Sequence, residues 1–159
     1  MKKLLSVLML LFPIVSLVSC SDDVESGAPQ TNTQITLTFD NVAVINGKIY
    51  ATQDYAMEIA SVTFKSPDNS TRSISDVEYR VDGRTASHSD YAPYTGRIDT
   101  RDLSTGTHPL GIYIDLNQSN NSTLPDNMQY NFIVVPSTDD LPDGAELGTF
   151  TQTVRVEPA

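Results

Sequence analysis

From Gln34 onward, polar and apolar residues alternate with a period of two rather than 3.6. This period places successive side chains on opposite faces, as in a β-strand half buried against a core. No stretch keeps a helical period over several turns. The apolar positions that define the clearest predicted strands are Ile35, Leu37 and Phe39; Val77, Tyr79 and Val81; Leu110, Ile112, Ile114 and Leu116; Met128, Tyr130, Phe132 and Val134; and Phe150, Val154 and Val156.

Turn signals separate these strands. Asn46-Gly47 lies between two β-prone runs and predicts a tight hairpin, because both turn positions take positive φ. Asp82-Gly83 ends the strand that begins at Val77, and the polar stretches 117–127 and 136–146 are predicted loops. Short strands at this spacing predict an all-β, antiparallel β-sandwich of seven or eight strands over residues 34–159.

The alternation slips by one residue between Tyr55 and Phe64. Tyr55, Met57 and Ile59 are apolar at odd positions, whereas Val62 and Phe64 are apolar at even ones. A strand buries both sets on one face only if its phase changes, so we predict a β-bulge near Ala60-Ser61. The alternative is a strand that is buried on both faces.

The first residues form a different pattern. Lys2 and Lys3 precede an apolar run from Leu4 to Val18, which is typical of a signal peptide. A membrane-spanning helix needs about 18 or more apolar residues, and this run is shorter and contains Pro13. Residues 1–19 are therefore predicted to be a leader that is removed.

Leu17-Val18-Ser19-Cys20 resembles the lipobox of bacterial lipoproteins. The resemblance implies cleavage before Cys20 and a diacylglycerol on its thiol, and the several acyl chains of that family imply a stable membrane anchor. Cys20 is the only cysteine, so no internal disulfide is possible, and lipidation would account for a lone thiol in an exported protein. The alternative is an ordinary cleaved signal that happens to end near a cysteine.

The residues after Cys20 bear on location. Serine at position 21 resembles the sorting pattern for the outer membrane, and Asp22-Asp23 resembles a surface-export signal of lipoproteins in Gram-negative bacteria. We expect the cell surface, with the periplasmic face as the alternative. Residues 20–33 are polar and predicted to be a flexible tether, with a root-mean-square reach of about 20 Å.

Charge excludes one class of partner. Removal of Lys2 and Lys3 from the 10 basic residues leaves 8 against 20 acidic ones, a net charge of −12 on the 140 residues from Cys20. Such a surface repels nucleic acid, so no DNA or RNA partner is expected. Solubility alone is a sufficient reason for this acidity.

A further set of short motifs lies in the block from Ile74 to Leu116. They are Val77 to Gly83, Ala92-Pro93-Tyr94, Ile98-Asp99-Thr100, Asp102-Leu103 and Gly106-Thr107-His108. In these motifs the block resembles the immunoglobulin-like modules found beside bacterial surface hydrolases and adhesins, although the position of Ile98 is usually aromatic there. The resemblance implies an immunoglobulin-like sandwich that serves as a spacer or binding module and seldom as an enzyme.

Ser87-His88-Ser89-Asp90 contains the residue types of a hydrolase triad. Triads are assembled from separate segments, and no Gly-Xaa-Ser-Xaa-Gly elbow is present, so we predict a polar turn and no enzyme activity. His88 and His108 have no partner at zinc-ligand spacing. His108 is instead predicted to be a hydrogen-bonded residue at the boundary of the core.

An acidic loop carries Asp139, Asp140 and Asp143. Calcium takes six to eight oxygen ligands, and Leu141 occupies a position that a calcium loop gives to a ligand. We therefore expect no metal and no other cofactor.

Tyr91 and Tyr94 flank Pro93 in a predicted loop. Exposed tyrosines beside a rigid proline can stack on a sugar ring or a partner protein, with Asp90 supplying orientation, and these three residues are the candidate ligand-binding set. The alternative for Tyr94 is that its ring packs under the loop as an anchor.

These observations predict a lipid-anchored protein of the cell envelope with a non-enzymatic interaction or spacer role. One alternative is a glycan-binding accessory lipoprotein of a polysaccharide-uptake system, which needs an exposed aromatic platform. Another is an envelope or fimbrial assembly subunit, which needs a long unpaired edge strand.

Overall fold

The computed structural model describes residues 33–65, 73–117 and 128–156, so the leader, Cys20 and the predicted tether before residue 33 lie outside the described residues. Within these ranges the chain forms nine strands and two short 3-10 helices. They are β1 Thr33–Ile45, β2 Lys48–Thr52, β3 Met57–Lys65, β4 Ser73–Val81, β5 Arg84–Ser89, β6 Gly96–Ile98, η1 Thr100–Asp102, β7 Gly106–Asn117, β8 Met128–Val135, η2 Thr138–Asp140 and β9 Gly148–Val156.

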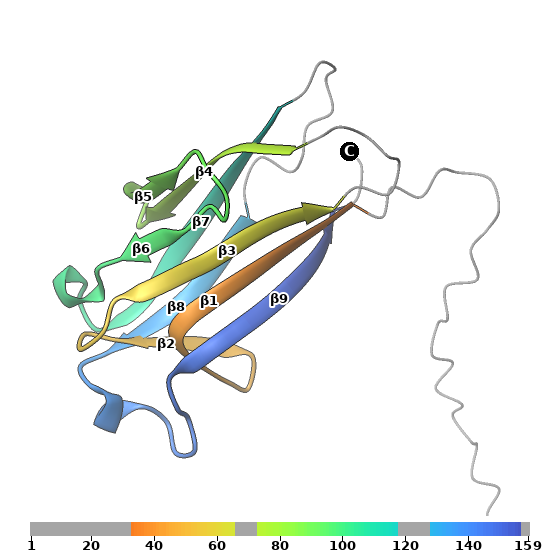
Figure 1. Cartoon of the computed structure of the whole chain (residues 1–159). Helices are drawn as coiled ribbons and strands as arrows, with labels where there is room; N and C mark the ends of the chain where they lie inside the picture. Colours follow the sequence, from red (N-terminus) through yellow and green to blue (C-terminus); the bar gives the residue numbers. More distant parts are fainter. Residues whose placement is uncertain (1–32, 66–72, 118–127, 157–159) are drawn as a thin grey trace, which may run out of the picture.

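The strands form two layers (Figure 1). The first sheet has the order β9-β1-β3-β6, and the second has the order β5-β4-β7-β8-β2. Strand β1 joins them, because its first half pairs with β3 and β9 while Ala43 to Ile45 pair with β2. The change of sheet follows a register shift at Asn41, whose φ is 58°. The fold is the all-β immunoglobulin-like sandwich that the alternation and the resemblance predicted.

The described residues form nine strands, one or two more than the expected seven or eight. Two further details differ from the sequence-based expectation. Strand β5, Arg84–Ser89, carries no apolar alternation, and its last residues fall in the predicted polar turn; it is a strand because it pairs antiparallel with β4. The pairing of β2 with β8 is parallel, with Ile49 opposite Phe132, whereas every other pair in the described ranges is antiparallel. Both features depend on which strand lies beside which, and a local pattern does not contain that information.

The predicted hairpin is confirmed. Asn46 and Gly47 have φ of 50° and 73°, and the strands on either side pair from Ile45 and Lys48 outward. These are the positive values that a two-residue hairpin turn requires.

The predicted bulge is also confirmed. Thr38 pairs with Ser61 and Phe39 pairs with Ile59, so Ala60 has no opposite residue on β1. The extra residue turns both Ile59 and Val62 into the core. The prediction was wrong for Tyr55, which precedes β3 and is 55% exposed.

The core lies between the two sheets and is built from alternate residues of β1, β3, β4, β7 and β8. Phe39 stacks on Phe150 with ring centroids 6.3 Å apart and meets Tyr130 edge-on at 5.6 Å. The largest fully buried side chains are Tyr79, Phe39, Phe132, Ile35, Leu37, Met57, Ile59, Ile98, Leu110 and Ile112.

His108 lies at the boundary of this core, as predicted. Its Nδ1 is 2.7 Å from Asp82 Oδ2 and its Nε2 is 2.7 Å from the Ser104 carbonyl oxygen. Both partners are acceptors, so a protonated ring that donates from both nitrogens satisfies the two contacts. Burial opposes the charge, but the hydrogen bonds to Ser104 and Asp82 outweigh it and raise the pKa of His108.

Candidate binding site

A groove runs between the facing edges of the two sheets, where β5 approaches β6. We call it the β5–β6 groove; it encloses about 370 Å³. The two edges are joined directly, because the Arg97 backbone N–H donates to Ser87 Oγ at 3.2 Å. The lining residues are Glu58, Ile59, Ala60, Ser87, His88, Ser89, Tyr91, Thr95, Gly96 and Arg97.

The loop that borders this groove, residues 90–95, is held by hydrogen bonds to the sheets and within itself. The Tyr94 N–H donates to the Tyr91 carbonyl at 2.8 Å, which closes a turn around the cis Ala92-Pro93 bond. The Val62 N–H donates to the Pro93 carbonyl at 2.9 Å, and Ser89 Oγ donates to the Tyr91 carbonyl at 3.1 Å. The backbone on both sides of Tyr91 is therefore fixed to the sandwich.

Tyr94 anchors the loop and is not among the residues that line the groove. Its half-buried ring packs against the core, and its hydroxyl donates to the Ile74 carbonyl at 2.6 Å. Its own carbonyl accepts a hydrogen bond from the Tyr79 hydroxyl. Tyr79 is fully buried, and burial raises the pKa of its hydroxyl well above the ordinary value, so it stays a donor. Of the two roles predicted for Tyr94, the structure therefore supports the second, in which its ring packs under the loop as an anchor.

Gly96 lets this arrangement close. An added Cβ at position 96 would lie 2.6 Å from the ring of Tyr79, inside van der Waals contact. The close approach of β6 to the buried ring therefore requires a residue without a side chain.

The structure places Tyr91 and Asp90 differently from Tyr94. Tyr91 is 68% exposed and lines the β5–β6 groove, so its ring is available to a ligand. Asp90 is exposed and is not among the groove-lining residues. Of the three predicted ligand-binding residues, one lines the groove, one lies beside it and one anchors the loop.

Charged side chains border the groove, and sequence reasoning missed most of them. Arg97 Nη1 is 2.9 Å from Glu58 Oε1 across the β3–β6 pair, and His88 Nε2 contacts the Asp76 carboxylate. Exposed pairs of this kind stabilise a fold little, which leaves the groups open to competition from a ligand. Only the strand pairing brings Arg97 and Glu58 together, so no sequence spacing could have identified them.

The serines next to His88 are engaged elsewhere. Ser87 Oγ accepts from Arg97, and Ser89 Oγ donates to the Tyr91 carbonyl. Successive residues of β5 point to opposite faces, which separates His88 from both hydroxyls. This geometry does not form a nucleophile–base pair.

A third tyrosine, Tyr113, lies on the outer face of the second sheet. Its ring covers Gly111, and the Arg80 guanidinium carbon lies 4.4 Å from the ring centroid. Arg80 also bonds Glu78 at 2.6 Å, and hydrogen bonds from Arg80 and then Thr85 lower the pKa of Glu78 to about 2. Tyr113 is half buried, and the Arg80 guanidinium lies over one face of its ring.

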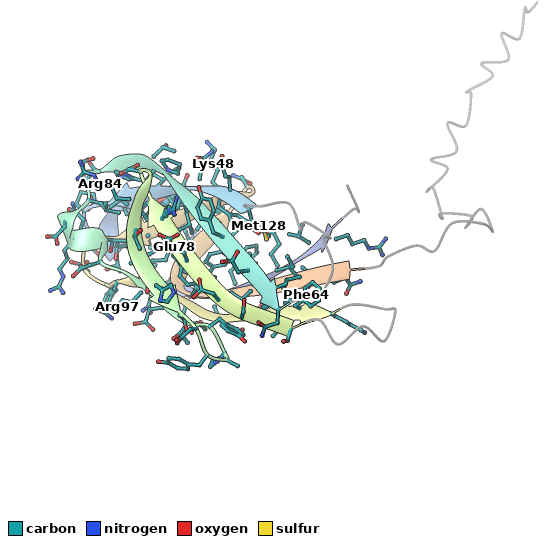
Figure 2. All side chains as sticks on the ribbon, turned by 90° about the horizontal axis from the view of Figure 1, so that it is seen from above. Lys48, Phe64, Glu78, Arg84, Arg97 and Met128 are labelled. Atoms are coloured by element: carbon teal, nitrogen blue, oxygen red, sulfur yellow. The ribbon has the colours of Figure 1, made fainter. Side chains whose placement is uncertain are left out.

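A second groove lies on the other side of the sandwich, between β9 and the edge of β8. We call it the β8–β9 groove; its volume is about 540 Å³. Figure 2 places Lys48, from this groove, and Arg97, from the first, on opposite sides of the molecule. The lining residues are Val44, Gly47, Lys48, Ile49, Thr107, Gln129, Tyr130, Asn131, Ile133, Phe150 and Gln152.

The Tyr130 hydroxyl is buried at this groove without a hydrogen-bond partner among the described residues. Burial raises the pKa of this hydroxyl to about 12.

The aspartates of the acidic loop do not form a cluster of metal ligands. Within residues 33–65, 73–117 and 128–156, no three His, Cys, Asp or Glu side chains lie close enough to hold a metal ion. No helix in these same ranges is long and apolar enough to cross a membrane.

Comparison with known proteins gives little further information. No protein-family model matches the chain, and no curated protein matches it. Among solved structures, the fibronectin(III)-like modules of Clostridium thermocellum CbhA align with 65% of this chain at 16% identity and a TM-score of 0.38. The alignment spans 47% of that structure's length. A likeness this weak carries no inference about the ligand.

Proposed function

We propose that the chain is a lipid-anchored protein of the outer cell envelope whose immunoglobulin-like domain binds a partner non-enzymatically at the β5–β6 groove. The lipobox-like residues before Cys20 support the anchor, and Ser21 with the acidic pair after it supports the outer membrane and its outer face. The periplasmic face is the alternative location. In this proposal the membrane is one partner of the protein, which is attached to it by the lipid on Cys20.

The observation that favours binding over a passive spacer role is the presentation of Tyr91. A large aromatic ring left mostly in water stabilises the fold little, yet the loop on both sides of it is fixed by backbone hydrogen bonds. A tyrosine on a fixed backbone has only two side-chain torsions to order when a ligand covers its ring, and this small entropy cost makes it an effective contact residue.

A second and more specific candidate function is glycan binding at the β5–β6 groove. An exposed aromatic face stacks on the apolar face of a sugar, and hydroxyl and charged groups then fix its orientation. The groove supplies such groups next to Tyr91 in Ser87, Thr95 and Arg97. This is the role expected of an accessory lipoprotein in polysaccharide uptake.

The test of binding is a titration of the chain without its first 20 residues against a panel of soluble polysaccharides. If Tyr91 contributes about 1–3 kcal/mol, by analogy with base–aromatic stacking, Tyr91→Ala weakens binding by roughly five- to a hundredfold. Tyr55→Ala is the matched control, because Tyr55 is also exposed but lies outside the groove. Binding that Tyr91→Ala leaves unchanged would exclude this site, and no binding to any glycan would leave a protein partner or a spacer role.

The anchor is tested separately with Cys20→Ala, followed by membrane fractionation. We expect the variant to be unprocessed or soluble, because the only thiol that can carry the diacylglycerol is gone. Electrophoretic mobility distinguishes the two outcomes, because an unprocessed chain keeps its 19-residue leader, and a radioactive fatty acid should label neither form. Retention of a processed, unlabelled variant in the membrane pellet would contradict the lipobox interpretation.

A further inference from the structure

The long edge of the first sheet is the second feature that the fold leaves open. Strand β9 has nine residues and pairs only with β1 in the described part of the chain, so it forms the border of the front layer in Figure 1. In an antiparallel strand every second residue turns its N–H and C=O to one side, so β9 presents a row of backbone donors and acceptors along its outer edge. Natural proteins usually protect such an edge with a proline, a bulge or an inward charge.

From Phe150 to Val156 the strand has no proline and no irregularity in its pairing with β1; the one register shift lies at the Gly148 end. Arg155 is its single charged residue and is exposed. The opposite border of the sandwich differs, because β6 has only three residues and lies against β5. Of the two end strands of the first sheet, β9 is the longer, and it pairs with no strand besides β1 in the described residues.

The sequence of β9 is complementary to itself. When the strand is paired antiparallel with a second copy around Gln152, Phe150 lies opposite Val154, Thr151 opposite Thr153, and Thr149 opposite Arg155. Each pair joins like with like in polarity, and no two like charges meet. A shift by one residue in either strand would place apolar residues on the polar face, so this register is distinguished from its neighbours.

The outer face already contains the matching interaction inside one molecule. Thr36 Oγ1 and Thr153 Oγ1 are 2.8 Å apart, and Thr38 Oγ1 and Thr151 Oγ1 are 3.1 Å apart, so β1 and β9 are joined by a ladder of hydroxyl hydrogen bonds. The Thr151–Thr153 pairs of a second copy would continue this ladder across the new junction.

The core-facing side of β9 borders the β8–β9 groove, which Phe150 and Gln152 both line. Gln152 faces the core side, opposite fully buried Leu37, yet it is exposed. In this register a second copy would place its Val154 and Gln152 opposite the groove-lining Phe150 and Gln152, and would cover the mouth of the groove. A polar residue in this position is explained if its amide meets the same amide of a second copy.

We propose that two copies of this chain pair through their β9 strands, antiparallel and with Gln152 at the two-fold axis, to form a continuous sheet across the dimer. An interface in which the same patch serves both copies closes as a dimer. One strand pair buries little surface and is weak between molecules free in solution. Confinement to a membrane by a lipid anchor would raise the effective concentration of the second copy and favour the pair.

The test is a disulfide cross-link in the full chain, expressed with its own leader and oxidised in isolated membranes. Directly opposite residues in an antiparallel pair have Cβ atoms about 4.5–5.5 Å apart, close to disulfide geometry, so Gln152→Cys is expected to migrate at twice the monomer mass without reductant. Arg155→Cys is the matched control. It is equally exposed, but the proposed register separates its two copies by roughly 20 Å, the length of six strand residues.

The unsubstituted chain controls for Cys20, its only cysteine. A doubled mass for Gln152→Cys, with little for Arg155→Cys and for the unsubstituted chain, supports the proposal. Equal cross-linking of the two variants would show random collision, and none for Gln152→Cys would show that the edges do not meet. Either result overturns the proposal, as does a Gln152→Cys adduct of another mass, because a different protein would then occupy the edge. The result is independent of the Tyr91 groove.

Discussion

Substitution of Tyr94 tests most directly how the binding loop is held. Tyr94→Phe removes one hydroxyl and leaves the buried Ile74 carbonyl without that donor, which should lower the free energy of unfolding by about 1 kcal/mol. Tyr94→Ala also removes a ring that packs against the core. Truncation of a fully buried aromatic costs about 3–5 kcal/mol, and this ring is half buried, so we expect a loss of about 2–3 kcal/mol.

The backbone of Tyr94 gives a sharper expectation. Its φ is 61°, a left-handed conformation that costs a residue with a Cβ about 1–2 kcal/mol and that glycine adopts readily. Tyr94→Gly should therefore be more stable than Tyr94→Ala by about 1 kcal/mol, although it removes one more carbon. At a normal φ the order would be reversed.

Urea unfolding followed by circular dichroism or tyrosine fluorescence measures these differences, since the chain has seven tyrosines and no tryptophan. The denaturant slope should stay constant across the series if only stability changes. Tyr91→Ala is the control and should fall within about 0.5 kcal/mol of the unsubstituted chain, because its ring is exposed. Equal stabilities for Tyr94→Ala and Tyr91→Ala would refute the anchoring role of Tyr94, and a Tyr94→Gly variant less stable than Tyr94→Ala would refute the backbone argument.

Three further predictions concern the fold. Gly96→Ala drives a Cβ into the buried ring of Tyr79 and should cost about 1–3 kcal/mol, which a lowered melting temperature would show and an unchanged one would contradict. Because the pKa of His108 is raised above 6.5, its stabilisation should be complete below that pH and be lost as pH rises through the folded value. The pH dependence of urea unfolding should flatten in His108→Gln; an identical dependence would sink the idea. Calcium or a chelator should leave the melting temperature unchanged, whereas a rise of several degrees with calcium would reveal a native-state site.

Much of the architecture follows from local chemistry and could be predicted from the sequence. Alternation at Ile35, Leu37 and Phe39 identified a half-buried strand, since the strand period is two whatever the partner. Asn46-Gly47 identified the hairpin through the backbone angles its residues tolerate. The phase slip near Ala60 identified the bulge, since the core must receive both sets of apolar side chains.

Part of the candidate site could also be read from the chain. Two tyrosines around Pro93 in a predicted loop indicated a candidate binding site at Tyr91. Its partners could not be found in this way: Glu58 lies on β3 and Arg97 on β6, 39 residues further along the chain, and only the pairing of these strands unites them. The sequence left two roles open for Tyr94, ligand contact or loop anchor, and its hydrogen bonds with Ile74 and Tyr79 decide between them.

Tertiary structure alone decided those roles and the open edge. Tyr94 became an anchor since Ile74 and Tyr79 present an acceptor and a donor to it from β4, while Tyr91 remains mostly in water. Strand β9 is the edge of its sheet, because it pairs with β1 on one side and with no strand of the described residues on the other. Local sequence sets backbone angles and which face is apolar, whereas strand order depends on contacts between residues far apart in the chain, and those contacts determine which side chains and edges remain free to bind.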